Sequence, residues 1–281
     1  MCIHHGQKAI FGDGKQYALP HVFVNPDQLQ TFINQMTAVF DGTADPISDI
    51  NLAAVPAEMQ FSDIYTAIGA FSAQAYKDGK PPYPMGQESV GVAVRDMDNA
   101  VRVAEEHGVK ILARWEVMGN QEAMTEWLDG LRIQFYAYAG TPPEIAVRES
   151  VSNTRYYLTP RAAERFIKTF LAVTGGRIVG DARHAGEEVG LPGESFHRVW
   201  LASSAGLFNV IILSDAQRAR LASPWRDIKT DFVVDDLAKV IALAQASQVS
   251  VLVPPEAGHS RHPRAVLEFT GGYVIALRQK A

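Results

Sequence analysis

Two stretches of the sequence share one pattern, and that pattern decides the fold. The first reads VAVRDMDNAVRVAEEHGVKILAR (Val92–Arg114) and the second reads FVVDDLAKVIALAQASQVSVLVP (Phe232–Pro254). They align without a gap at a spacing of 140 residues, the distance from Val94 to Val234. In each stretch a short apolar run is followed by apolar residues at helical spacing and then by a second apolar run. The pattern predicts a strand, a helix and a strand in both copies.

Both copies carry an apolar stripe along the predicted helix. The stripe recurs at i, i+3, i+4 and i+7, which is the spacing of one helix face turned toward a core. It consists of Met97, Ala100, Val101 and Ala104 in the first copy and of Leu237, Val240, Ile241 and Ala244 in the second. An aspartate stands just before each stripe, Asp96 or Asp236, and we expect it to cap the start of the helix.

A second repeated pair lies upstream of the first. HVFVNPDQLQTFINQMTAVFDG (His21–Gly42) aligns with RYYLTPRAAERFIKTFLAVTGG (Arg155–Gly176) at a spacing of 134 residues. Four strand–helix units in two pairs predict two homologous domains, residues 16–140 and 150–281, in which each unit continues with further strands. The alternative is a chance similarity between amphipathic units.

Composition and charge narrow the class of protein. The chain has 281 residues, of which 47% are hydrophobic and 20% are charged, and this is an ordinary globular composition. A formal net charge of −5 argues against nucleic acid as a partner. Cys2 is the single cysteine, which fits a reducing compartment. Because no apolar run resembles a secretory signal or a membrane span, we expect a cytoplasmic protein without a membrane partner.

The repeats resemble the vicinal oxygen chelate superfamily, which includes glyoxalases, bleomycin-resistance proteins and extradiol ring-cleaving dioxygenases. VVDDLAKVIALAQASQVSVLVPP (Val233–Pro255) and the terminal FTGGYVIALRQ (Phe269–Gln279) carry the resemblance. It implies an α/β (α+β) fold of tandem βαβββ units that form two glyoxalase-like domains. In such domains a curved mixed sheet surrounds a cavity.

The resemblance also allows a test for a metal site. Metal-dependent members place ligands on the first strand of each unit and on the last strand of the domain. In the second half these positions fall on Arg155, Lys229 and Ala276, which cannot hold a cation. In the first half they fall on His21, on Ser89 with Glu88 beside it, and on Gln134. We therefore expect no metal cofactor; a divalent metal held by His21, Glu88 and Gln134 is the less favoured alternative.

Several other residues are candidates for chemistry. We expect His21, Tyr157 and His197 to be catalytic, because imidazole and phenol groups exchange protons. The candidate substrate-binding residues share polar or aromatic side chains near the predicted strands, and they are Arg155, Lys229, Asp231, Gln134 and Trp200. The alternative is that Arg155 and Lys229 face solvent or pair with Asp231, and that His197 lies on the surface.

These observations predict a small-molecule enzyme that acts without a strongly bound metal. The predicted reaction is lyase- or isomerase-type proton transfer on an aromatic or carboxylated metabolite. A resistance-type protein that sequesters an aromatic compound is one alternative, and an extradiol dioxygenase with an atypical metal site is another. The expected partner is a small organic molecule, and a homodimer is possible.

Overall fold

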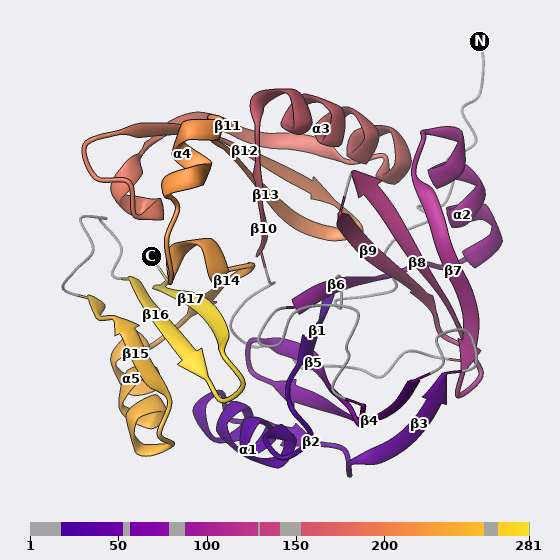
Figure 1. Ribbon diagram of the computed structural model, residues 1–281, viewed down its shortest axis with the longest axis horizontal. Helices are drawn as coiled ribbons and strands as arrows, with labels where there is room; N and C mark the ends of the chain where they lie inside the picture. Colours follow the sequence, from indigo (N-terminus) through magenta and orange to yellow (C-terminus); the bar gives the residue numbers. More distant parts are fainter. Residues whose placement is uncertain are drawn as a thin grey trace.

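The chain forms two curved sheets that follow one another in the sequence (Figure 1). The structure is a computed structural model that describes residues 18–52, 57–78, 88–128, 130–140, 153–255 and 264–280. The first sheet takes its strands from residues 18–137 and the second from residues 153–279. Within the described residues, none of the helices is long and apolar enough to cross a membrane.

The first sheet contains nine strands in the order β2-β4-β5-β1-β6-β9-β8-β7, and β3 pairs with β4 at its edge. The strands are β1 (Ala18–Phe23), β2 (Thr43–Ala44), β3 (Ser48–Leu52), β4 (Ala57–Thr66), β5 (Gly69–Tyr76), β6 (Glu88–Ala93), β7 (Lys110–Val117), β8 (Asn120–Leu128) and β9 (Leu131–Ala137). The two first strands of its units, β1 and β6, lie side by side at the centre and run antiparallel.

The second sheet contains eight strands in the order β11-β12-β13-β10-β14-β17-β16-β15. The strands are β10 (Asn153–Leu158), β11 (Arg177–Ala185), β12 (Ser195–Ser203), β13 (Gly206–Ile212), β14 (Thr230–Val234), β15 (Ser250–Val253), β16 (Arg264–Phe269) and β17 (Tyr273–Gln279). Again the two first strands, β10 and β14, are neighbours at the centre. The predicted fold class, tandem strand–helix–strand units in curved mixed sheets, is therefore confirmed.

Four helices pack between the two sheets. They are α1 (Leu29–Val39), α2 (Met97–Glu106), α3 (Pro160–Thr174) and α5 (Leu237–Ala246), whereas α4 (Asp215–Arg220) and two short 3-10 helices (Gly186–Val189 and Trp225–Asp227) lie in connections. One hydrophobic core packs α1 and α5 between the sheets, and another packs α2 and α3 (Figure 1). Because the helices cover one face of each sheet, the opposite faces remain for cavities.

The helix starts follow the predicted pattern. The Asp96 side chain accepts a hydrogen bond from the Asn99 backbone N–H, and the Asp236 side chain accepts one from Lys239. Both predicted caps are therefore confirmed. No strand was predicted from the sequence at β2, β3, β8, β11 or β16.

Candidate functional site

The two sheets place the residues of interest at equivalent central positions. His21 on β1 lies opposite Ser89 on β6, and β6 aligns Gly91 with Gln134 on β9. In the second sheet the Arg155 N–H donates to the Lys229 carbonyl at 2.6 Å, and Asp231 aligns with Ala276. The three positions at which metal-dependent members of the superfamily place ligands are therefore neighbours at the centre of each sheet. They hold His21, Ser89 and Gln134 in one and Arg155, Lys229 and Ala276 in the other.

His21 lies buried at the centre of the first sheet, with 5% of its surface exposed. Its ring lies over Gly91, where an added Cβ would overlap the imidazole Cε1. Burial lowers the pKa of His21 to about 4, although the carbonyls of Ser89 and Leu19 oppose this shift. The imidazole is therefore neutral near pH 7, and it offers a nitrogen as a hydrogen-bond partner rather than a positive charge.

His21 lines a cavity in the first sheet, and the carboxyl group of Glu122 on β8 lines the same cavity. Burial raises the pKa of Glu122 to about 7; the Trp115 indole and the Gln134 amide oppose the shift, and the Asp63 carboxyl adds to it. The Gln134 Nε2 donates to Glu122 Oε2 at 2.8 Å and fixes the orientation of the carboxyl group. The Glu122 carboxyl therefore holds a proton to a higher pH than an ordinary glutamate does.

Asp63 on β4 supplies a second acid to this cavity. Burial raises its pKa, a hydrogen bond from Ser72 lowers it, and repulsion from Asp45 raises it. The Asp63 carboxyl in turn disfavours the ionised form of Glu122. The cavity has a volume of about 130 Å³ and is completed mainly by aromatic and apolar side chains, among them Met59, Phe61, Val117, Tyr136 and Tyr138. We call it the first-sheet cavity.

The centre of the second sheet is occupied by an ion pair. The Arg155 guanidinium donates through Nε and Nη2 to both carboxylate oxygens of Asp231, a bidentate arrangement. Arg155 is 3% exposed, and its Nη1 donates to the Tyr157 hydroxyl at 3.2 Å. That hydroxyl in turn donates to the Trp225 carbonyl at 2.9 Å. The predicted alternative, in which Arg155 pairs with Asp231, is what the structure shows.

The remaining second-half candidates lie in three different places. Lys229 Nζ lies 5.9 Å from the centre of the Tyr157 ring. Trp200 lines a cavity on the concave face of the second sheet. His197 was expected to be catalytic, but it pairs with Asp181 and its side chain is 40% exposed. His197 and Trp200 are three residues apart on β12, so their side chains lie on opposite faces of the sheet. His197 therefore does not line that cavity.

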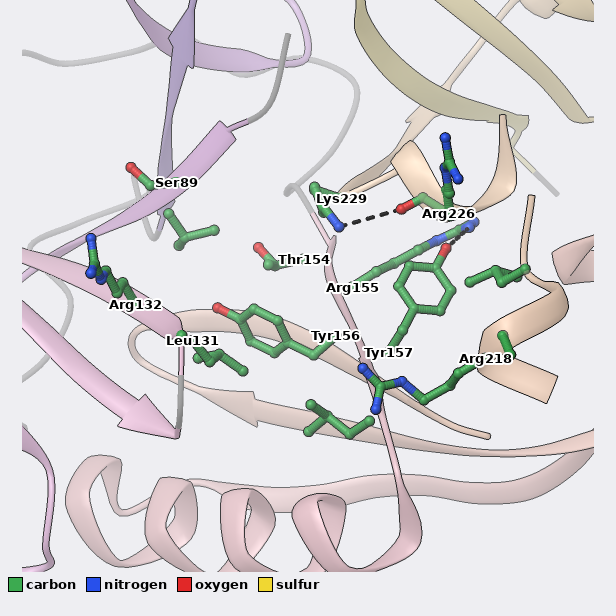
Figure 2. Close-up of a pocket in the computed structure, with 15 residues that line it drawn as sticks. Ser89, Leu131, Arg132, Thr154, Arg155, Tyr156, Tyr157, Arg218, Arg226 and Lys229 are labelled. Carbon is green, nitrogen blue, oxygen red and sulfur yellow. Dashed lines mark hydrogen bonds between the residues drawn. The ribbon is translucent and has the colours of Figure 1, made fainter. Parts of the chain in front are cut away.

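A third cavity of about 560 Å³ lies between the two sheets (Figure 2). Arg132 reaches it from the first sheet, whereas Lys229, Arg226 and Arg218 reach it from the second half. The β10–β14 pairing covers two residue pairs, against five for β1–β6, so β10 continues along this cavity beyond its partner strand. Arg155 lines both this cavity and the one inside the second sheet, and therefore forms part of the wall between them.

His21 and Gln134 were predicted from the sequence as site residues, whereas Asp63 and Glu122 were not. Acidic residues on a strand usually face solvent. For β4 and β8, the sequence prediction did not state which alternate residues face the cavity. The signal was present, because Asp63 precedes Ile64, a buried residue of the core beneath the helices. Alternation along the strand then directs Asp63 toward the opposite face.

The described residues do not fit a metal centre with three protein ligands. They contain no group of three His, Cys, Asp or Glu side chains placed to hold an ion. In the second sheet the equivalent positions hold a guanidinium, an ammonium and a methyl group, which cannot donate electron pairs to a cation. In the alternative set of the first sheet, Glu88 pairs with Val22 through its backbone, and its side chain lies outside the described residues.

Comparison with solved structures places the fold. A triple mutant of 4-hydroxymandelate synthase from Streptomyces coelicolor superposes with a TM-score of 0.62 and 11% identity, covering 95% of this chain and 92% of that one. A xylose isomerase-like TIM barrel/4-hydroxyphenylpyruvate dioxygenase fusion protein gives 0.56 and 12%, covering 98% of this chain and 50% of that one. The 2,3-dioxygenase LapB from Pseudomonas sp. KL28 gives 0.55 and 14%, covering 97% and 94%.

This chain therefore has the tandem-domain fold of the vicinal oxygen chelate superfamily, and the predicted resemblance is confirmed at the level of the fold. No protein-family model matches the sequence, and no curated protein matches it either. The expectation of no cofactor is contradicted, because dioxygenases of this fold are typically Fe(II)-dependent. Within the described residues, the side chains at the equivalent positions are poorly suited to hold such a metal.

Proposed function

We propose that this chain is an enzyme that binds a small aromatic molecule in the first-sheet cavity and exchanges a proton with it through Glu122. The observation that carries the proposal is a carboxyl group whose pKa is raised to about 7 inside a cavity that also contains His21 and Asp63. A group that titrates near the working pH is an effective general acid or base. Gln134 is the positioning residue, since its amide holds the Glu122 carboxyl.

The size and lining of the cavity support an aromatic substrate. A cavity of roughly 150 Å³ accommodates a benzene ring, and the first-sheet cavity measures about 130 Å³. The Tyr136 and Tyr138 rings meet edge to face, 5.3 Å apart, at its wall. Two of the matched structures carry 4-hydroxymandelate or 4-hydroxyphenylpyruvate in their names, and these are phenols that bear an acid group. We propose residues 16–140 and 150–281 as the two domains, with turnover in the first.

The test is a panel of 4-hydroxyphenyl acids and catechols incubated with the full chain, with products followed by mass spectrometry. Glu122→Gln removes the proton-transfer group and keeps the shape of the side chain, so we expect kcat to fall by roughly 100-fold or more. Glu126→Gln is the matched control, because Glu126 lies on the same strand and pairs with Lys110 at 3.1 Å. Equal rates for the two variants, or no product from any compound, would contradict the proposal.

Oxygen-dependent conversion of an aromatic ring is the second candidate. The three matched structures favour it, because each is a dioxygenase or a 4-hydroxymandelate synthase. The test is the metal content of the purified protein together with oxygen uptake on catechols, with and without added Fe(II). Stoichiometric iron and chelator-sensitive oxygen uptake would replace the first proposal with this one.

A further inference from the structure

The concave face of the second sheet contains a cavity of about 150 Å³ that is separate from the site of the proposed proton transfer. Its lining combines polar side chains from seven strands with one indole ring. Besides the Arg155–Asp231 pair, the residues that matter are Arg198, Arg264, His184, Asn209 and Trp200. We call this the second-sheet cavity.

Several nitrogen atoms of this lining are buried and have no hydrogen-bond partner within the described residues. They are Nε and Nη2 of Arg198, Nε of Arg264 and Nε2 of His184. Arg198 itself is 4% exposed. Each of the three arginine nitrogens is a donor, and a buried donor without a partner is unfavourable, most of all on a charged group. Three of them in one cavity therefore require an explanation.

The carboxylates beside this cavity do not neutralise its guanidinium groups. Asp231 is engaged by Arg155. The single Glu188 carboxylate accepts from Arg198 Nη1 at 2.9 Å and from Arg264 Nη1 at 3.1 Å, and it also contacts His184. Burial opposes ionisation of Glu188, but the two arginines lower its pKa to about 2. Arg155, Arg198 and Arg264 thus share two carboxylates, and a fourth arginine of the lining, Arg278, adds a further positive charge.

We infer that the second-sheet cavity is a binding site for a small organic carboxylate. A carboxylate would accept hydrogen bonds from the unpaired Arg198 and Arg264 nitrogens and would balance the excess positive charge. The Arg198 guanidinium lies 5.4 Å from the Trp200 ring centre, and the His184 ring meets Trp200 edge to face at 5.0 Å. This aromatic wall suits a ligand with a flat apolar part beside its acid group.

Trp200 has a fixed place in this wall. An added Cβ at Gly180 would lie 2.6 Å from the Trp200 ring. Because Gly180 has no side chain, the indole can lie close against β11 at that position. The cavity is therefore preorganised, with its cationic and aromatic groups held before a ligand arrives. This site is separate from the first-sheet cavity and does not depend on the reaction proposed there.

The first test compares benzoate with benzamide by titration calorimetry on the full chain. The two molecules have nearly the same shape, but only benzoate carries a charge at pH 7. We expect saturable binding of benzoate that weakens with added salt, and no saturable binding of benzamide. Equal binding of the two, or no saturable binding of benzoate, would overturn the inference.

Two variants and a matched control locate the site. Arg264→Gln removes one cation whose side chain is only 28% exposed, and we expect benzoate to bind at least roughly tenfold more weakly. Glu188→Gln removes the competing carboxylate, so benzoate should bind more tightly. Arg183→Gln is the control, because Arg183 is exposed next to His184 on β11 and lies outside the cavity lining.

Each comparison has an outcome that rejects the inference. Equal affinities for Arg264→Gln and Arg183→Gln would place benzoate elsewhere. Weaker benzoate binding by Glu188→Gln would show that the carboxylate supports the site rather than competing with the ligand. Because Glu188→Gln should act in the direction opposite to Arg264→Gln, it also separates a binding effect from partial loss of fold.

Discussion

The centres of the two sheets occupy equivalent places in the fold and contain opposite chemistry. In the first sheet the neutral His21 lies over Gly91. In the second sheet the aligned positions hold Arg155 and Asp231, which bind each other. A glycine leaves space for an imidazole, whereas an aspartate fills that space and neutralises a guanidinium. The fold therefore sets where a functional group can stand, and two residues decide whether the place holds an acid–base cavity or an ion pair.

Of the substitutions at these two centres, removal of the Asp231 carboxylate should lower the free energy of unfolding most. Asp231→Ala leaves the Arg155 charge buried without its carboxylate, so we expect the free energy of unfolding to fall by about 3–5 kcal/mol. Denaturant titration measures it. Asp235→Ala is the control, because Asp235 pairs with Lys280 at the surface and should cost less than about 1 kcal/mol. Similar losses for both variants would mean that Arg155 does not depend on its partner.

Gly91→Ala tests the corresponding place in the first sheet. The added methyl group would collide with the His21 ring, and overpacking of this kind typically costs about 1–3 kcal/mol. Gly140→Ala is the control, since a Cβ there meets no atom within 4 Å and the change should stay within about 0.5 kcal/mol. Thermal and chemical unfolding measure both. An unaltered stability for Gly91→Ala would indicate that His21 can turn away freely.

The raised pKa of Glu122 predicts a pH dependence of stability. A carboxyl group whose folded pKa lies near 7 rather than near 4.5 stabilises the fold below about pH 4.5, and this contribution is lost as the pH rises through 7. Because Glu122 is only partly buried, we expect a loss of about 1–2 kcal/mol between pH 5 and 8. The difference between wild type and Glu122→Gln isolates it, since His21 titrates in both. A difference that stays constant with pH would contradict the assignment.

Lys229 should give the smallest effect. Its ammonium group lies 5.9 Å from the Tyr157 ring centre, and a cation–π contact at a partly exposed site contributes about 0.5–1 kcal/mol. Lys229→Met keeps most of the side-chain volume and removes the charge, so denaturant titration should show a loss below about 1 kcal/mol. A larger loss of stability would mean that the Lys229 ammonium group also stabilises the Arg155–Asp231 ion pair.

The sequence predicted the fold well because the repeats are local patterns. The stripe that begins at Met97 and the cap at Asp96 need only nearby residues, and the structure confirms both. The strand β8 was missed because polar Thr125 is buried on its core face. Its hydroxyl is satisfied by donating to the Ile133 carbonyl and by accepting from the Trp127 indole, and such compensation is visible only in three dimensions.

The sites were less predictable because they depend on strand register and on which side chain pairs with which. His21 and Gln134 could be identified from the repeat alone, since they occupy the positions of the family comparison. The meeting of Glu122 with Asp63 requires the order of strands in the sheet. The choice between Arg155 as a ligand-binding group and as a partner of Asp231 could be stated from the sequence, but only the geometry decided it.

The most direct measurement pairs two variants with two readouts. Glu122→Gln and Arg264→Gln are each assayed for turnover of the aromatic substrate and for benzoate binding. We expect Glu122→Gln to lose turnover and keep benzoate binding, and Arg264→Gln to lose benzoate binding and keep turnover. Loss of both properties in either variant, or of neither in both, would contradict the division of chemistry between the two sheets.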